Sequence, residues 1–221
     1  MAVEYEIRNA GGQTGTFTTA AIMNDRSVLM SPSVFQWLKE GRVYVANRGV
    51  LTTPVAFAGT TITSLRPDLA VRCPAGTVMI PLFVQIYWEA TGGTIVEAII
   101  RTASVDVGAG TSTAVTPINA NTRYASRASA MTVAREYTAD CAAVTDGNEV
   151  FRVGSPTDLD ANNAGTLSHA TWSPLTSGAF PVLVGGTNAG SLLVNTATAT
   201  SSTGFVIAAW AEFTSAEFYG S

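Results

Sequence analysis

The sequence predicts an all-β protein: an antiparallel sandwich that follows a short N-terminal arm with one short helix. From about residue 54 onward, short apolar segments alternate with residues that form turns. The last apolar segment is apolar on both faces, which is typical of a strand at the centre of a sheet. One segment, near residues 32–40, has the pattern of a helix.

The first 50 residues are expected to form the arm, and residues 51–221 the sandwich domain. Val3, Tyr5 and Ile7 alternate with charged residues, as in a short strand with one apolar face. A glycine-rich turn follows at residues 11–15.

The helix of the arm is predicted over Ser31–Glu40. Ser31 is a good N-cap, Pro32 suits the first helical position, and Gly41 can end the helix. Val34, Trp37 and Leu38 follow helical spacing and form one apolar face. Because so short a helix is unstable alone in water, Trp37 needs a surface on its own domain or on a neighbour.

Ten strands are expected after the arm, separated by segments rich in Gly, Pro, Asn, Asp and Thr. Many short strands with such spacing indicate a sandwich or jelly roll, and no fixed-period repeat suggests a propeller or solenoid. The expected strands span Val55–Ile62, Leu69–Arg72, Val78–Ala90, Thr94–Val107, Ala128–Tyr137, Val150–Val153, Leu167–Trp172, Phe180–Val184, Ser191–Asn195 and Gly204–Phe213.

The two longest strands, Val78–Ala90 and Thr94–Val107, are predicted to form a hairpin. A three-residue loop, Thr91 to Gly93, gives the register with one nearly apolar face. In that register the pairs are Trp88 with Val96, Ile86 with Ala98, and Val84 with Ile100.

Composition leaves two interpretations equally open, a surface that is buried against other proteins and a domain whose outer strands are merely rich in Thr, and it argues against nucleic-acid binding. Charged residues are 13% of the chain, against roughly 25% in an average domain, and Lys39 is the only lysine. Few charges need desolvating when such a surface is buried. The net charge is −4, and the scattered arginines form no run that would neutralise phosphates.

Cysteine usage and hydropathy indicate synthesis and folding in a cytoplasm. Cys73 and Cys141 are too few for a secreted disulfide scaffold, so we expect both to be reduced and partly buried. The start, MAVEYEIRNAGG, lacks the features of a signal peptide. No segment approaches the ~20 apolar residues of a membrane helix.

No enzyme chemistry is predicted, and no catalytic, cofactor-binding or metal-binding residue is assigned. The single histidine, His169, alternates with apolar residues in an expected strand, which favours a structural role. A triad needs a nucleophile and an orienting acid beside it, and a zinc site needs several His or Cys ligands.

Two acidic patterns favour ordinary structural roles. The segment Asp158–Asn162 resembles the start of a calcium loop, but Asn163 and His169 stand where an EF-hand needs glycine and glutamate. A turn stabilised by Asx side chains is favoured over a weak cation site. Glu89 and Glu97 would share a face of the hairpin near Arg101, and a surface charge cluster is favoured over a glycosidase pair.

Several segments of the chain carry a resemblance to a known family. Val78-Met79-Ile80-Pro81-Leu82-Phe83-Val84 opens a long strand that reaches a glycine turn, Gly108-Ala109-Gly110-Thr111 and Thr116-Pro117-Ile118-Asn119 follow, and the chain closes on an aromatic-rich strand. Over residues 50–221 the order resembles the jelly-roll decoration, or cement, proteins on the heads of tailed bacteriophages. Members of this family have no catalytic residues, so the resemblance implies none in this chain.

This resemblance implies a jelly roll similar to the tumour-necrosis-factor trimer. It implies a homotrimer on the outside of a virion that binds the major capsid protein and cements neighbouring subunits, without membrane or nucleic-acid contacts. The helix of the arm would supply the capsid contact, through Phe35, Trp37 and Leu38.

Two other functions stay open. One is a receptor- or glycan-binding head-fibre protein on the same fold, which needs an exposed cleft with an aromatic residue beside Asn or Asp. Its candidate aromatics are Tyr124, Trp172 and Tyr219. The other is a jelly-roll shell subunit, which would assemble into shells by itself.

Overall fold

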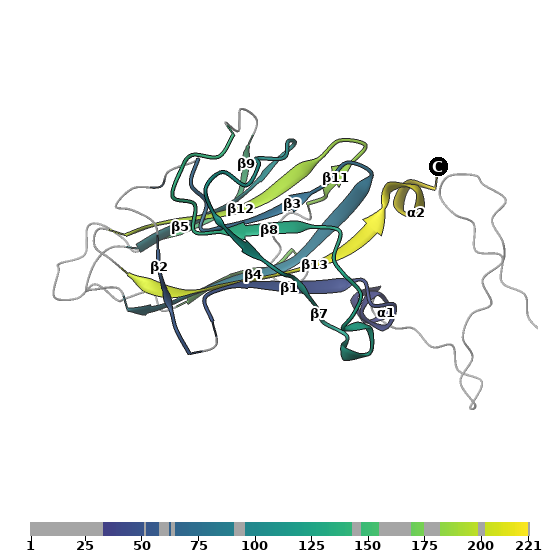
Figure 1. Ribbon diagram of the computed structural model, residues 1–221, viewed down its shortest axis with the longest axis horizontal. Coiled ribbons are helices and arrows are strands. Elements are labelled where there is room, and N and C mark those ends of the chain that lie inside the picture. The colour runs from purple at the N-terminus through teal and green to yellow at the C-terminus, as the bar shows by residue number, and fades with distance from the viewer. Residues whose placement is uncertain are drawn as a thin grey trace, which may run out of the picture. The chain divides into compact units, whose positions relative to one another are not determined.

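The computed structural model describes residues 33–50, 52–57, 62, 65–90, 96–142, 147–154, 169–174, 182–198 and 202–220. Contacts divide the chain into Met1–Gln36 and Trp37–Ser221, and the division falls within helix α1 (Ser33–Lys39). The second unit is an all-β sandwich, as predicted, with two antiparallel sheets stacked around a common core (Figure 1).

The first sheet, called sheet I, has the C-terminal strand at its centre. Along this sheet the strands are β10 (His169–Trp172), β4 (Thr77–Ala90), β13 (Thr203–Thr214), β1 (Val43–Arg48) and β7 (Ile118–Asn119). Two short strands join it, β11 (Val184–Gly186) on β4 and β2 (Val55–Ala56) on β13.

The second sheet, called sheet II, covers the other side of the core. Its strands are, in order, β6 (Thr113–Val115), β8 (Thr132–Arg135), β3 (Leu69–Cys73), β12 (Gly190–Thr198), β5 (Val96–Ala103) and β9 (Asn148–Gly154). Each neighbouring pair in sheet II is antiparallel.

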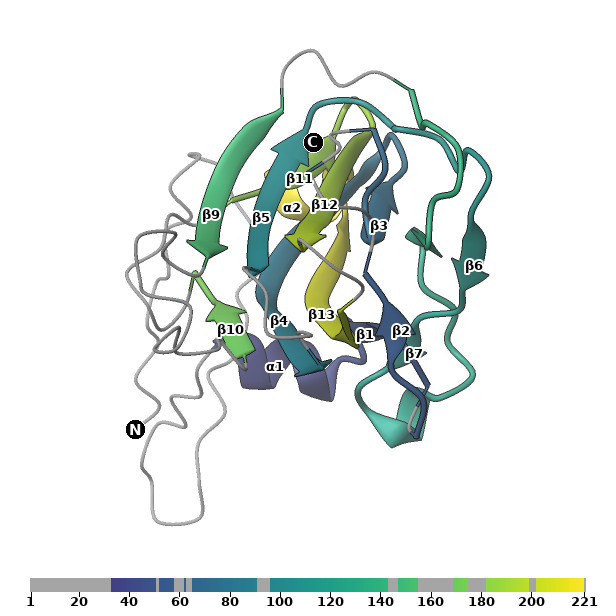
Figure 2. The same ribbon diagram turned by 90° about the vertical axis from the view of Figure 1, so that its left-hand side faces the viewer.

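The topology is that of a jelly roll. The strands β1, β3, β4, β5, β9, β10, β12 and β13 form the framework in chain order. Sheet I holds the first, eighth, third and sixth of them side by side, and sheet II the second, seventh, fourth and fifth. The chain therefore crosses repeatedly between the sheets, as Figure 2 shows. An excursion between β5 and β9 adds β6, β7, β8 and the short 3-10 helix η1 (Thr122–Tyr124).

The predicted hairpin between β4 and β5 is wrong, because the two strands lie in different sheets. Strand β4 pairs with β13 and β10, and β5 pairs with β12 and β9. The predicted inward faces are nonetheless correct: Val84, Ile86, Trp88, Val96, Ala98 and Ile100 are all buried in one core cluster. Alternation determines which face a residue occupies, but it does not determine which strand lies beside it.

The final strand is central, as predicted, but it is not buried on both sides as expected, because Phe205 and Ile207 on its outward face are only half-buried. Strand β13 lies between β4 and β1, and the side chains of Val206, Ala208 and Trp210 fill the core beneath it. Strand β1, by contrast, lies within the first 50 residues, where an arm was expected. Its inner residues Tyr44 and Ala46 belong to the core, so the sandwich includes Val43–Arg48.

Helix α1 occupies Ser33–Lys39, within the segment predicted to be helical; Ser31 and Pro32 lie outside the described residues. Gly41 ends it at φ +67°, where the Gly41 N–H donates to Leu38 O and the Arg42 N–H donates to Trp37 O. A Cβ at position 41 would lie 2.5 Å from the Tyr124 ring, so only glycine fits. No helix among the described residues is long and apolar enough to cross a membrane.

A buried ion pair joins the two sheets near one end of the core. Arg48 on β1 and Asp68 before β3 are each about 1% exposed, and Arg48 Nη2 lies 3.2 Å from Asp68 Oδ1. The other carboxylate oxygen accepts hydrogen bonds from the backbone N–H and hydroxyl of Thr196. The Arg48 guanidinium stacks 4.8 Å from the centre of the Phe57 ring, while its Nε and Nη1 have no hydrogen-bond partner.

Substitution of Asp68 by alanine is expected to destabilise the fold by about 3–5 kcal/mol, because it leaves the Arg48 charge buried without its counter-ion. Equilibrium unfolding in urea measures this loss. The double variant Arg48→Met/Asp68→Leu is the control and should lose less stability than Asp68→Ala, because no buried charge remains. An Asp68→Ala protein as stable as wild type would show that the pair is not needed.

Candidate interaction surface

The outward face of sheet I carries a continuous set of apolar side chains. Cross-strand register places them in rows: Tyr87 lies opposite Phe205, and Ile207 lies between Gln85 and Asn47. A further row runs from Phe83 through Ala209 and Val45 to Ile118. We call the larger apolar members of these rows the outer patch: Val45, Phe83, Tyr87, Ile118, Phe205 and Ile207.

The outer patch is accessible. Ile118 is 66% exposed and Tyr87 is 46% exposed, while the other four side chains are half-buried. The rings of Tyr87 and Phe205 contact each other, with centroids 6.3 Å apart. Large apolar side chains that gather on one face, and are not scattered singly, mark a site of protein contact.

The rows that carry the outer patch contain no Asp, Glu, Lys or Arg. Their polar members are two amides, Gln85 and Asn47, one hydroxyl, Thr171, and one histidine, His169. Interface centres are depleted in charge and enriched in aromatic residues, and this face has both properties. His169 is exposed on the edge strand β10, beside Tyr87, which places it on the surface of the sandwich and not in its core.

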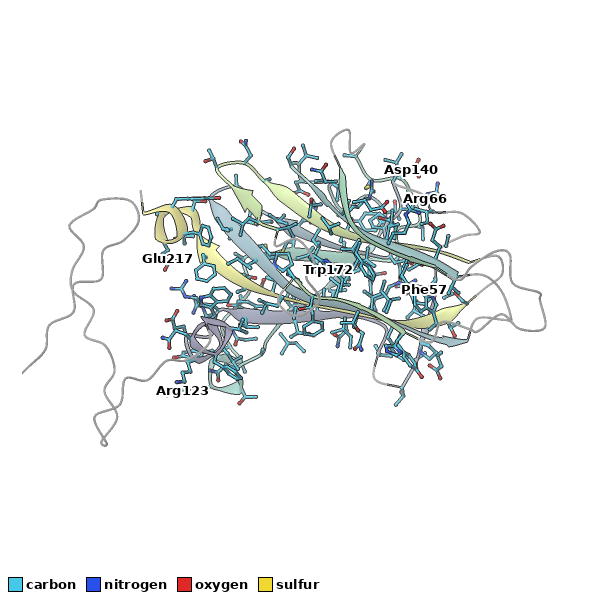
Figure 3. The ribbon with its side chains drawn as sticks, turned by 180° about the vertical axis from the view of Figure 1, so that it is seen from behind. Phe57, Arg66, Arg123, Asp140, Trp172 and Glu217 are labelled. Carbon is cyan, nitrogen blue, oxygen red and sulfur yellow. The ribbon has the colours of Figure 1, made fainter. Side chains whose placement is uncertain are left out.

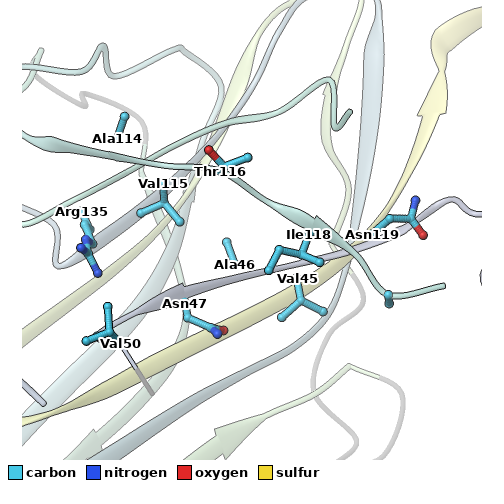
Figure 4. A pocket seen from close by; sticks show the side chains of 12 residues that line it. Val45, Ala46, Asn47, Val50, Ala114, Val115, Thr116, Ile118, Asn119 and Arg135 are labelled. Atoms are coloured by element: carbon cyan, nitrogen blue, oxygen red, sulfur yellow. The ribbon is translucent and has the colours of Figure 1, made fainter. Parts of the chain in front are cut away.

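An apolar cleft continues the outer patch around the edge of sheet I. It has a volume of about 420 Å³ and lies between β1 and the segment that leads from β6 to β7 (Figure 4). Its lining includes Val45 and Ile118 of the patch, together with Val50, Ala114 and Val115. Since the patch and this edge cleft share residues, they form one contact surface that turns a corner.

The three helix residues predicted to contact a capsid do not form one exposed surface. Phe35 is 58% exposed. Trp37 is half-buried and packs edge-on against Phe213 of β13, with ring centroids 5.4 Å apart. Leu38 is half-buried as well. Trp37 thus finds its surface on its own domain, and Phe35 is the aromatic residue of α1 that remains accessible.

Trp37 belongs to a chain of rings that reaches the C-terminal helix α2 (Ser215–Tyr219). Phe213 contacts Phe218 at 5.7 Å between centroids, and Phe218 contacts Tyr219 at 5.1 Å. The Arg42 guanidinium lies 5.0 Å from the Phe213 ring centre. These contacts hold α2 against the start of β1.

An ion pair reinforces this attachment. Arg42 Nη1 and Nη2 each donate to one oxygen of Glu217 at 3.1 Å, and Glu217 also forms a capping box with Thr214. Figure 3 shows Glu217 on α2. The Arg42 guanidinium and the hydrogen bonds from Thr214 lower the pKa of Glu217 to about 2.

The aromatic residues proposed for glycan recognition lie in three different environments. Trp172 is fully buried between the sheets, so it cannot contact a ligand (Figure 3). Tyr124 is half-buried against Gly41. Tyr219 is 58% exposed and lines a second cleft, at the end of the sandwich. Of the three, Tyr219 has the exposure and the concave setting that the proposal needs.

The carboxylates weighed as a catalytic pair do not share a site. Glu89 lies on β4 in sheet I, and Glu97 lies on β5 in sheet II, where it pairs with Arg152. Arg101 is buried on sheet II and its Nε donates to Asn195 Oδ1. The expected cluster fails because it depended on the hairpin.

The two cysteines are buried and unpaired thiols, as expected. Burial raises the pKa of Cys73 to about 12, and burial also raises the pKa of Cys141. Neither thiol is therefore activated as a nucleophile at neutral pH. The segment Asp158–Asn162, weighed as a cation loop, lies outside the described residues.

Comparison with known proteins finds no match for this chain among protein-family models, curated proteins or solved structures.

Acid is expected to loosen α2 in a defined pH window. The ordinary pKa of a glutamate is 4.5, and that of Glu217 is about 2, so the ion pair contributes fully above pH 4.5 and is lost as the pH falls toward 2. Because the carboxylate is half exposed, the effect is modest and weakens with added salt. Amide exchange of residues 215–220, followed by NMR, measures it.

Glu217→Gln is the matched variant. It should already show the faster α2 exchange at neutral pH and should lose the pH dependence in that window. If wild type and Glu217→Gln exchange alike at neutral pH, the ion pair does not hold the helix.

Proposed function

We propose that this chain is a structural protein of a virus particle. In this proposal it self-associates as a trimer through the outer patch, stands on the exterior of a tailed-bacteriophage capsid, and cements neighbouring major capsid subunits. The observation that carries the proposal is the set of uncharged, partly aromatic rows of the outer patch; Glu89 lies on the same face of β4 but beyond these rows. The order of segments that resembles phage decoration proteins supplies the identity of the assembly.

The shape of the contact surface favours a ring over a two-fold dimer. The outer patch presents Tyr87 and Phe205 on a face, whereas the edge cleft presents Ile118 and Val50 around a corner. When the face of one copy meets the edge of the next, the contact is head-to-tail, and such contacts form a ring when the rotation between copies closes and an open filament when it does not. A trimer is the ring that the family resemblance implies.

Helix α1 is the part we assign to the capsid. Phe35 is its accessible aromatic residue, while Trp37 already packs against Phe213. Specific contacts typically bury about 800 Å² per partner. Three arms in one trimer would multiply such modest contacts through multivalency, which is how a decoration protein strengthens a shell without any bond being made or broken.

The oligomer is expected to dissociate when charge enters the outer patch. Tyr87→Arg or Ile118→Arg should weaken self-association by about 2 kcal/mol or more, because each buries an unpaired charge at the contact. Sedimentation equilibrium gives the mass. Val105→Arg is the control, since Val105 is 40% exposed but lies outside the patch. A wild-type chain that is a monomer, or that forms closed shells alone, would overturn the proposal.

Capsid binding is expected to depend on Phe35. Phe35→Ala should reduce saturable binding to undecorated capsids and lower the resistance of decorated particles to heat and low salt, because it removes the exposed aromatic anchor. Lys39→Ala, on the same helix, is the matched control. Trp37→Ala is a less specific test, since it also disturbs the contact with Phe213. Particles decorated by Phe35→Ala that resist as well as wild type would exclude this anchor.

A further inference from the structure

A polar cleft opens at the end of the sandwich where the chain finishes, and we call it the end cleft. Its volume is about 740 Å³, within the range of about 300–1,000 Å³ that small-molecule sites occupy. It is lined by the last residue of α2, Tyr219, and by three segments at strand ends: 102–104, 147–148 and 183–189. None of these residues belongs to the outer patch or to the edge cleft.

The jelly-roll register brings these distant segments together. Ser191 of β12 pairs with Ala103 of β5, and Thr102 pairs with Asn148 of β9. In sheet I, Thr77 of β4 pairs with both Gly186 and Thr214. The end of β5, the start of β9 and the turn that joins β11 to β12 therefore lie at the end of the sandwich that carries α2.

The chemistry of the end cleft is uncharged and rich in hydrogen-bonding groups. Among the residues that the structure describes, the lining contains no Asp, Glu, Lys, Arg or His. Asn148, Thr187 and Asn188 are exposed there, and each amide side chain both donates and accepts hydrogen bonds. A charged ligand would find no counter-ion in this lining, and a purely apolar ligand would desolvate the amides without replacing their hydrogen bonds.

Tyr219 supplies an exposed aromatic surface in the end cleft. Its ring packs edge-on against Phe218, and α2 is tied down by Thr214, Glu217 and Arg42. Beside the ring, Gly186 has a φ of +122° and carries no side chain that could cover the ring. A Cβ on Gly186 would lie only 3.5 Å from the tyrosine hydroxyl. The ring is thus held in place before any ligand arrives, which lowers the cost of binding.

We propose that the end cleft binds a neutral saccharide. The C–H face of one sugar ring stacks on Tyr219, and its hydroxyl groups hydrogen-bond to the side chains of Asn148 and Asn188. A pyranose has an apolar face and a rim of hydroxyls that donate and accept, which matches an aromatic ring flanked by amides. This activity is separate from self-association and would let a decorated particle attach to uncharged glycans.

Titration followed by ¹H–¹⁵N NMR tests the proposal, with the methyl glycosides of glucose, galactose, mannose and N-acetylglucosamine as probes. A glycan array of neutral oligosaccharides then extends the search to linkages. At least one neutral sugar should shift the signals of residues 147–148, 186–189 and 219. Tyr219→Leu and Asn188→Ala should each weaken its binding by about tenfold or more, the loss expected for one good contact.

Tyr87→Leu is the matched control, because Tyr87 is an exposed tyrosine on the outer patch. It should leave binding of these monovalent sugars unchanged. The proposal is overturned if no neutral saccharide binds the folded protein, if Tyr219→Leu binds as well as wild type, or if only sialic or uronic acids bind. Self-association is measured separately, by the mass of the oligomer. If no sugar binds although the trimer is intact, the saccharide site is refuted and the proposed self-association is not.

Discussion

The pairing of β13 with both β1 and β4 is the constraint on which the rest of this structure depends. The last strand must enter between the first strand and the third of the framework, so sheet I is complete only when the whole chain is present. Its inner side chain Trp210 fills the core, its outer side chains Phe205 and Ile207 form the middle of the outer patch, and its end carries α2. Such contacts are far apart in sequence, and topologies of this kind fold slowly.

The positions of the charged residues show why the low charge content of the chain matters for its surface. Arg152 pairs with Glu97 and Glu149, and Arg66 pairs with Asp140, all on the surface and away from the rows of the outer patch. Arg48 is buried in the core, where it pairs with Asp68. The rows of the outer patch hold mainly aromatic, aliphatic and amide side chains, which can be buried against another protein at little desolvation cost.

The two accessible surfaces differ in the kind of contact they suit. The outer patch and edge cleft are apolar and extended, as protein contacts are, whereas the end cleft is concave and polar around one tyrosine. They are separated because one is built from strand faces and the other from loops at a strand end. A rigid sandwich that presents loops at its end is a common way for proteins to carry a binding site apart from their assembly surface.

Strand β1 shows how far local pattern can be trusted. The run Val43-Tyr44-Val45-Ala46 has β-branched residues on one face and an aromatic and a small residue on the other, a pattern typical of a strand, but no strand was predicted there and the segment was included in the arm. Among the candidate site residues, Trp37 and Leu38 share the apolar face predicted by helical spacing, and Phe35 was named as an aromatic anchor. Helical spacing correctly separates a half-buried face from an exposed one. It does not reveal that Trp37 packs against Phe213, which lies far along the chain.

The amino-acid sequence by itself determined the all-β class, the short helix, the central final strand and the inward faces of β4 and β5. All of these follow from periodicity and turn chemistry, which are local. Only the tertiary structure decided that β4 and β5 part into different sheets, that Tyr87 meets Phe205, and that Tyr219 reaches the loop beside Gly186. Those facts depend on which strand lies beside which. Backbone hydrogen bonds between strands are alike for every partner, so the choice of neighbouring strand depends on how the whole core packs.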